Sequence, residues 1–264
     1  MKIGQDPWES GDPYELFMGR WSRLIAAEFI HWLSIPSDQS WIDIGCGTGS
    51  LSKTILTLAS PAHILALDPS IRFIETARRA IDDPRVNFEV GIASRLPAST
   101  NTFDAIVSGL VLNFIPDPIQ AVNEMRRVDR RDGVVAAYVW DYAQGMEMLR
   151  YFWDAAIALD PSIRELDEGL RFPICQPERL KRLFVKAGLR EIKVQAIEVM
   201  TVFRDFDDYW LPFLGGQGPA PGYVASLNSK RRVALKNALR ERLPISDDGS
   251  IELQARAWAV KGRK

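Results

Sequence analysis

The segment 41–49, Trp-Ile-Asp-Ile-Gly-Cys-Gly-Thr-Gly, contains the residues best suited to holding a ligand. A short apolar run carrying one carboxylate, Asp43, ends in glycines at three alternate positions. Glycine removes side chains where a ligand must approach the backbone, and it permits positive φ. The apolar spacing after Gly49 predicts a helix, whose first N–H groups are free to bind a polar or anionic ligand.

A second carboxylate, Asp68, stands nineteen residues after Gly49, at the end of the apolar run 64–67. An acidic residue at the end of the second strand is the usual partner of ribose hydroxyls in nucleotide-type cofactors. The two carboxylates and the glycines therefore predict a cofactor site at the ends of two neighbouring strands.

These residues resemble motifs I and II of the class I S-adenosylmethionine (SAM) dependent methyltransferases. Segments 91–97 and 103–108 are similar to the third and fourth motifs of the members that act on small molecules. Residues 127–133 resemble the turn before the fifth strand, and residues 14–22 resemble the helix before motif I. The resemblance covers about residues 14 to 141, and it implies S-adenosyl-L-methionine as the cofactor.

The resemblance also assigns cofactor contacts. Asp43 is expected to order the glycine loop, Asp68 to accept from the ribose hydroxyls, and Arg20 to pair with the SAM carboxylate. Ile92 departs from the family, because many members have aspartate there to bind the adenine amino group. The expected cofactor-binding residues are Arg20, Asp43, Gly45, Cys46, Gly47, Asp68, Pro69, Ile92, Ala93, Ser94 and Ser108.

Two other functions fit parts of the pattern. An NAD(P)-dependent Rossmann oxidoreductase also uses a glycine-rich first turn, but its sixth position is glycine and here it is Ser50. A carboxylate two residues before the first glycine is also unusual in a buried parallel strand. A non-catalytic SAM-binding protein is the third hypothesis, and only an activity test separates it from an enzyme.

Residues for catalysis are few. His31 and His63 are expected to be structural, so a histidine base is not expected. The candidates at the strand ends are Asn113, Asp141 and Tyr142. Asp141 is equally well interpreted as a loop residue that caps the helix near 146, and methyl transfer needs alignment more than acid–base help. No cluster of carboxylates indicates a metal site.

Composition limits the partners and the location. The net charge of −1 argues against a chain built to hold nucleic acid. The runs 126–131 and 230–232 are rich in arginine and lysine, and we interpret both as solvated faces. Two cysteines and a polar start without an apolar core favour a cytoplasmic protein, and no apolar run is long enough for a membrane span. The expected partner is a small-molecule substrate.

Regular strand–helix alternation from 41 to 140 predicts an α/β fold, a Rossmann-like doubly wound sheet. Ser70 and Asp117 are expected N-caps, Gly188 is expected to end the helix at 177–187, and the fifth strand is expected at 133–140. The resemblance adds a reversed seventh strand, matching the alternation at 251–259. We expect one domain with a cap: a core of 1–144, cap insertions at 145–170 and 206–246, and core segments 171–205 and 247–264. The aromatic residues of the predicted cap indicate that the substrate, which accepts the methyl group, is partly apolar. The expected acceptor contacts are Tyr14, Trp210, Phe213 and Tyr223.

Overall fold

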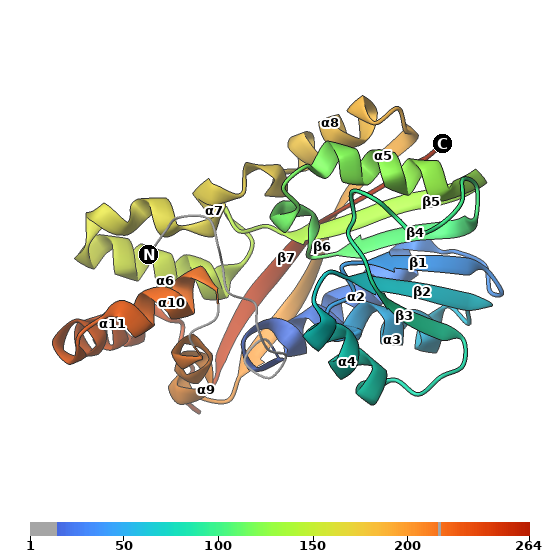
Figure 1. Cartoon of the computed structure of the whole chain (residues 1–264). Coiled ribbons are helices and arrows are strands. Elements are labelled where there is room, and N and C mark those ends of the chain that lie inside the picture. The colour runs from blue at the N-terminus through green and yellow to red at the C-terminus, as the bar shows by residue number, and fades with distance from the viewer. Residues whose placement is uncertain (1–14, 216–217) are drawn as a thin grey trace. The chain divides into compact units, whose positions relative to one another are not determined.

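The computed structural model describes residues 15–215 and 218–264, and Tyr14 lies outside the described residues. The chain forms a seven-stranded sheet flanked by helices, in the order β3-β2-β1-β4-β5-β7-β6 (Figure 1). β7 runs antiparallel to its neighbours, so the predicted Rossmann-like sheet with a reversed last strand is confirmed. The strands are β1 (Ser40–Ile44), β2 (His63–Asp68), β3 (Val86–Val90), β4 (Phe103–Gly109), β5 (Asp129–Trp140), β6 (Arg190–Phe203) and β7 (Ile251–Arg263).

Helices alternate with the first five strands and then dominate the second half of the chain. The α-helices are α2 (Arg20–Leu33), α3 (Ser50–Leu58), α4 (Ile71–Ala80), α5 (Pro118–Val128), α6 (Glu147–Leu159), α7 (Glu168–Arg171), α8 (Pro177–Lys186), α9 (Phe206–Trp210), α10 (Pro219–Ser226) and α11 (Ser229–Arg242). The shorter turns are η1 (Glu15–Gly19), η2 (Leu112–Phe114), η3 (Pro161–Leu166), η4 (Pro173–Cys175) and η5 (Leu211–Leu214).

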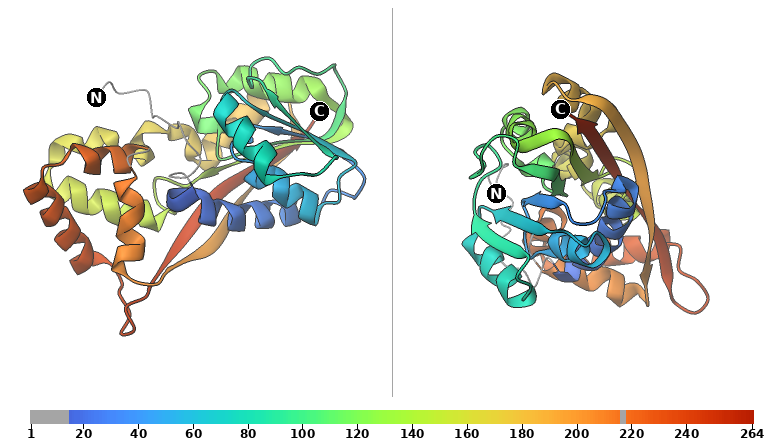
Figure 2. Two further views of the ribbon diagram at one scale, coloured as in Figure 1. Left: turned by 60° about the horizontal axis from the view of Figure 1, so that its bottom comes forward. Right: turned by 90° about the vertical axis from the view of Figure 1, so that its right-hand side faces the viewer.

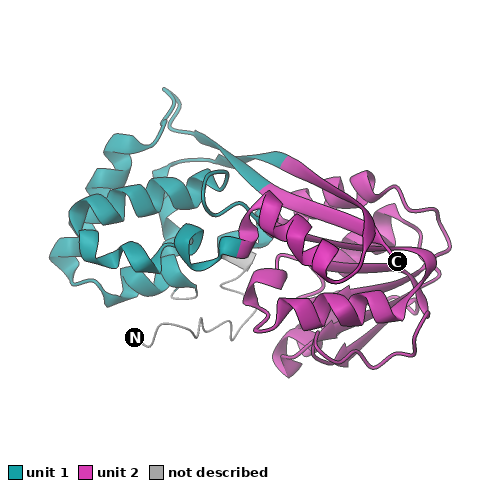
Figure 3. Cartoon of the chain, turned by 90° about the horizontal axis from the view of Figure 1, so that it is seen from above, with its two compact units in different colours: residues 1–21, 140–173, 198–256 teal, residues 22–139, 174–197, 257–264 magenta. Residues whose placement is uncertain are grey.

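The chain divides into two compact units (Figure 3). Unit 1 comprises residues 1–21, 140–173 and 198–256, and unit 2 comprises 22–139, 174–197 and 257–264. Both predicted cap segments lie in unit 1, together with the outer parts of β6 and β7. The division into core and cap stays a prediction.

Unit 2 contains the parallel strands β1 to β5, and helices cover both faces of this part of the sheet. α3 and α4 lie on one face, and α5 and α8 lie on the other and pack against each other (Figures 1 and 2). β1 pairs in parallel with both β2 and β4, so the strand order reverses between β1 and β4. In open α/β sheets a ligand binds beyond the carboxyl ends of the strands at such a reversal.

Local signals place the helix ends in unit 2. Ser70 accepts a hydrogen bond from the N–H of Phe73, and Asp117 accepts one from the N–H of Gln120. Both residues are N-caps, as predicted. Gly188 follows α8 with a φ of 78°, which confirms its predicted role at the end of that helix.

The fifth strand differs from its prediction. It begins at Asp129 and not at residue 133, because Asp129 already pairs with Phe103 before the register shifts. Regular pairing resumes at Val134, opposite Ala105. The expected turn is therefore a bulge within β5, and its Asp132 has a φ of 70°.

Unit 1 is mainly helical. α6 packs against α10 and α11, and Phe152 and Trp153 of α6 contact the ring of Tyr223 on α10. Phe152 and Phe213 stack with their ring centroids 4.5 Å apart. The Tyr209 hydroxyl donates to the Met148 carbonyl over 2.9 Å and so satisfies the one polar group that this ring buries.

Candidate functional site

The glycine loop between β1 and α3 is the centre of the site in unit 2. Gly45, Gly47 and Gly49 all have positive φ, of 74°, 53° and 89°. A Cβ at Gly45 would lie 2.6 Å from the side chain of Val111, so that glycine is required for packing. A Cβ at Gly47 would meet no protein atom within 4 Å. Open space beside Gly47 fits the predicted approach of a ligand to the backbone.

Asp43 on β1 is fully buried beneath this loop. Its Oδ2 accepts a hydrogen bond of 2.7 Å from the hydroxyl of Ser52 on α3, whereas its Oδ1 has no hydrogen-bond partner. Burial, opposed by the Ser52 hydrogen bond and assisted by the nearby Asp68, raises the pKa of Asp43 to about 7. An unpartnered buried oxygen is costly and needs an explanation, which a ligand donor or cation would supply.

Asp68 at the end of β2 ties the glycine loop to the next helix. Its Oδ2 accepts from the N–H of Gly47 over 3.0 Å, and its Oδ1 accepts from the N–H of Ser70 over 2.8 Å. Burial raises the pKa of Asp68, and the two backbone hydrogen bonds lower it. A carboxylate has about four acceptor positions, so two remain for ribose hydroxyls.

The same loop holds Cys46, which is buried and unavailable as a surface nucleophile. Burial raises the pKa of this thiol well above its usual value, and the carboxylates of Asp43 and Asp68 raise it further. Ser108, near the end of β4, is fully buried and donates to the Ile44 carbonyl over 2.9 Å. These contacts join the ends of β1 and β4 at the reversal of strand order.

The residues predicted to meet adenine follow β3 in unit 2. Ile92 is 52% exposed, and it forms an isolated bridge with Arg95. The Ser94 carbonyl accepts from the side chain of Gln120 on α5. Ala93 is half-buried between them, and Pro69 is exposed after β2. An exposed isoleucine beside the strand ends could pack on an aromatic ring, as expected from the sequence.

Asn113 lies in the short turn η2 after β4, also in unit 2. Both polar atoms of its amide, Nδ2 and Oδ1, are buried and have no hydrogen-bond partner among the described residues. An amide with donor and acceptor both unpaired is unusual in a folded interior. Asn113 is therefore suited to binding a polar group of a ligand.

The other two catalytic candidates lie in unit 1. Asp141 accepts from Arg256 over 2.7 and 2.8 Å at Oδ2, and from the N–H of Gln144 at Oδ1. These contacts tie the turn after β5 to β7, which favours the loop-ordering interpretation of Asp141. Tyr142 is buried, with its ring 5.8 Å from that of Phe172.

Arg20 also lies in unit 1, at the start of α2. Its Nη1 donates to both carboxylate oxygens of Asp208 over 3.1 Å, and its guanidinium stacks on the rings of Trp21 and Phe203. Nε and Nη2 are buried without a partner. The sequence did not reveal this pairing, because Arg20 and Asp208 are 188 residues apart.

The predicted acceptor contacts are buried in the interior of unit 1. Phe213 is fully buried, Trp210 is 4% exposed and Tyr223 is 8% exposed. Phe213 contacts the rings of Phe152, Tyr209 and Trp210. These residues join the helices of unit 1 to one another, and their contact with an acceptor stays a prediction.

Two residues outside the set of predicted site residues make structural contacts in unit 2. Ser52 holds Asp43, and its position one turn into α3 was the available signal. Arg127 belongs to the basic run that was interpreted as a solvated face, and its side chain is 33% exposed and also paired with the protein. Its guanidinium donates to Glu124 and to two backbone carbonyls of the loop before β4.

Comparisons with known proteins agree with this geometry. Residues 42–137 match the family described as "Methyltransferase domain". Demethylmenaquinone methyltransferase of Halalkalibacterium halodurans is 30% identical over 181 residues, which cover 62% of this chain and 72% of that enzyme. The chloroplastic 2-methyl-6-phytyl-1,4-hydroquinone methyltransferase 2 of Oryza sativa subsp. japonica is 30% identical over 59% of this chain. The chain spans 40% of the length of that rice enzyme.

A solved structure has the same fold. Phosphoethanolamine N-methyltransferase 2 of Haemonchus contortus, in complex with phosphomonomethylethanolamine and S-adenosylhomocysteine, superposes with a TM-score of 0.59 at 16% identity. The superposition covers 96% of this chain and 56% of the worm protein. Among residues 15–215 and 218–264, no helix has the length and apolar character needed to cross a membrane.

Proposed function

Because this chain belongs to the class I SAM-dependent methyltransferase family, we propose that it transfers the methyl group of SAM to a small, partly apolar acceptor. Membership follows from the similarity to demethylmenaquinone methyltransferase and from the fold, and it confirms the family predicted from the sequence. One observation supports the placement of SAM. The glycine loop leaves open space beside Gly47, and Asp43, just before this loop, has a buried Oδ1 without a hydrogen-bond partner.

The residues of unit 2 fit the parts of SAM. The ribose hydroxyls would donate to the free acceptor positions of Asp68, and the methionine part would pass Gly47. The positive ammonium group would favour the ionised form of Asp43. Ile92 would pack on the adenine ring, with Ala93 and Ser94 beside it.

SAM supplies an electrophilic methyl group on its sulfonium sulfur. The chain then has to align an acceptor and exclude water, and alignment alone accounts for a large part of such a rate increase. The histidines are unsuited to act as a base at this site: His31 is exposed on α2, and His63 begins β2 at the end opposite Asp68. Asn113, with its unpaired amide, is the proposed contact for a polar group of the acceptor.

The proposed acceptor is a ring compound with apolar substituents. The names of the rice and Halalkalibacterium relatives describe methylation of a hydroquinone and of demethylmenaquinone. A partly apolar ligand also agrees with the aromatic side chains that the sequence supplies in residues 206–246. The cytoplasmic location expected from the cysteine content is part of the proposal, and both cysteines are free in the structure.

The decisive experiment uses SAM with an isotopically labelled methyl group. The full chain is incubated with this SAM and a panel of hydroquinones and other small phenols, and products are detected by mass spectrometry. Label in a ring compound, lost in a Gly47→Val variant, is the expected result. Binding of S-adenosylhomocysteine without transfer to any small molecule would favour the non-catalytic alternative, and tight binding of NAD would overturn the cofactor assignment.

A further inference from the structure

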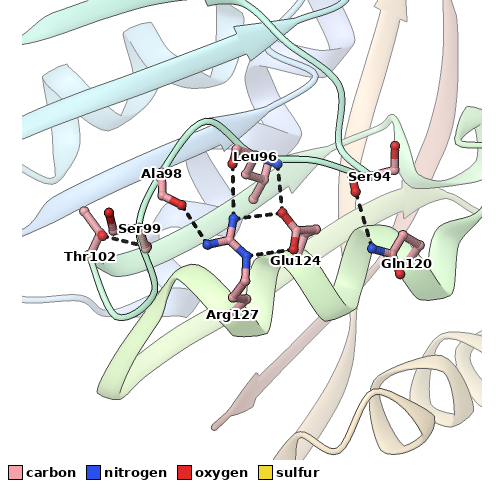
Figure 4. Close-up of polar contacts among 8 residues, drawn as sticks. All are labelled: Ser94, Leu96, Ala98, Ser99, Thr102, Gln120, Glu124 and Arg127. Atoms are coloured by element: carbon pink, nitrogen blue, oxygen red, sulfur yellow. Dashed lines mark hydrogen bonds and ion pairs between the residues drawn. The ribbon is translucent and has the colours of Figure 1, made fainter.

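Three side chains on one face of α5 are bound to the loop that connects β3 with β4 (Figure 4). Gln120, Glu124 and Arg127 are spaced by four and three residues, so they follow one another along the same side of the helix. All three lie in unit 2 together with the loop. Their hydrogen bonds to the loop go to its backbone, so these bonds fix the path of the chain.

Arg127 and Glu124 form a bidentate ion pair. Arg127 Nε lies 2.7 Å from Glu124 Oε1, and Arg127 Nη2 lies 2.8 Å from Glu124 Oε2. This geometry uses the planar fork of arginine, which lysine cannot reproduce. The pair is partly buried, with the glutamate side chain 13% exposed. The hydrogen bonds from Arg127 hold the pKa of Glu124 below its usual value.

The ion pair also forms hydrogen bonds with the backbone of the loop (Figure 4). Arg127 donates to the carbonyls of Ala98 and Leu96 over 2.7 and 3.1 Å. Glu124 accepts from the N–H of Leu96 over 2.9 Å. Both polar backbone groups of Leu96 are therefore held by one ion pair, while its side chain is buried.

The remainder of the loop is anchored at both ends. The N–H of Gly91 donates to the carbonyl of Asp68, the predicted ribose ligand. The N–H groups of Asn101 and Thr102 donate to the carbonyls of Arg127 and Val128 at the end of α5. Between these anchors lie residues 92–94, where the Ile92 carbonyl accepts from the N–H of Arg95 and the Ser94 carbonyl accepts from Gln120.

We propose that Glu124 and Arg127 are positioning residues for the adenine part of the cofactor site. By fixing Leu96 and Ala98 they hold residues 92–94 in the place where adenine packs. The inference rests on the proposed function, since it takes residues 92–94 as the adenine contact. Loss of the pair should release this segment and weaken the binding of the base, with the ribose and homocysteine contacts left intact.

The test compares two ligands that differ in the base. S-adenosylhomocysteine carries adenine, whereas S-ribosylhomocysteine has the same ribose and homocysteine without it. The variant Arg127→Met removes the donors and keeps the apolar stem. The matched control is Arg130→Met, which removes an ion pair with Asp104 elsewhere in unit 2. Binding is measured by calorimetry or competition, and hydrogen exchange is followed for residues 91–102.

Arg127→Met should lower the affinity for S-adenosylhomocysteine about tenfold, which corresponds to the free energy of one charge-assisted hydrogen bond. The affinity for S-ribosylhomocysteine should stay unchanged. Exchange of residues 91–102 should become faster in this variant and not in the control. Arg127→Lys keeps the charge and can reach one carbonyl, so its affinity for S-adenosylhomocysteine should lie between those of the parent chain and Arg127→Met. This variant replaces Arg127→Met in the test if Arg127→Met does not fold. Equal weakening of both ligands, or the same weakening in Arg130→Met, would overturn the inference.

A further variant separates this inference from the proposed site. If Ile92→Ala weakens S-adenosylhomocysteine but Arg127→Met does not, the adenine site is correct and the positioning role is wrong. If Ile92→Ala has no effect on the binding of either ligand, adenine does not pack there, and the proposed site and this inference both fail.

Discussion

The two units bury carboxylates in different ways. In unit 1, Asp141 is paired with Arg256, Asp167 is paired with Arg150, and Glu168 accepts from the indole of Trp153. In unit 2, Asp43 is fully buried at the strand ends with one oxygen unpartnered. A buried polar group without a partner lowers stability, and it is tolerated where a ligand completes the pairing. Asp43 therefore marks the strand ends of unit 2 as a place where a ligand can complete the pairing.

The largest expected effect is loss of cofactor binding in Gly47→Val. A branched side chain would fill the open space beside this residue and is strained at a φ of 53°. We expect no measurable binding of S-adenosylhomocysteine by calorimetry. The matched control is Gly249→Val in the turn before β7, because Gly249 has a φ of 87° and equally open surroundings. If both variants lose binding, backbone strain and not the occupied space is the cause.

The next effect tests the interior of unit 1. Phe213→Ala should lower the free energy of unfolding by about 3–5 kcal/mol, because Phe213 is fully buried against other rings. Affinity for S-adenosylhomocysteine should stay close to that of the parent chain at a temperature where the variant is folded. Phe213→Leu is the control and should cost less than about 1.5 kcal/mol. A raised acceptor KM in Tyr223→Phe or Trp210→Phe, without loss of stability, would show that these aromatics also bind the acceptor.

A smaller effect is expected for the ribose contact. Asp68→Ala should weaken the binding of S-adenosylhomocysteine by about 1–3 kcal/mol, because the ribose hydroxyls lose their charged hydrogen-bond acceptor. It also removes the bonds to the N–H groups of Gly47 and Ser70, so hydrogen exchange of the glycine loop should become faster. Asp83→Ala, at a partly exposed aspartate paired with Arg85, serves as the control. Unchanged affinity in Asp68→Ala would contradict the ribose assignment.

The units also differ in how far the sequence predicts them. In unit 2 the strand and helix limits are marked by local signals, such as the caps Ser70 and Asp117, and these are confirmed. The start of β5 was not predicted, since the bulge near Asp132 interrupts the apolar pattern although the pairing continues. The end of β7 was missed because Lys261-Gly262-Arg263 breaks the alternation that marks the strand.

The side-chain pairings of unit 1 have no local signal. Asp141 and Arg256 are 115 residues apart, and only the paired strands bring them together. A carboxylate at the end of a strand therefore fits both a catalytic and a structural role when only the sequence is known. Arg127 shows the same limit in unit 2: its neighbours indicate a solvated run, and the two carbonyls that it binds come from a loop about thirty residues earlier.

The last prediction concerns the pH dependence of stability and of ligand binding. It compares one buried carboxyl group in each unit, Asp43 in unit 2 and Glu168 in unit 1. Burial raises the pKa of both Asp43 and Glu168 to about 7. Each group keeps its proton in the folded state at pH values where the unfolded chain has lost it, so each lowers stability as pH rises from about 4 to 7. Asp43→Asn and Glu168→Gln should each flatten this dependence, measured by denaturant unfolding at several pH values.

Ligand binding should distinguish the same two groups. The ammonium of S-adenosylhomocysteine favours ionised Asp43, so affinity should increase by up to about tenfold between about pH 6 and pH 8. Asp43→Asn should abolish this increase and lower the affinity at pH 8. Glu168→Gln should leave affinity and its pH dependence as in the parent chain, because the partners of Glu168 lie in unit 1. A pH dependence of binding that follows Glu168 and not Asp43 would reverse the assignment of the ligand to unit 2.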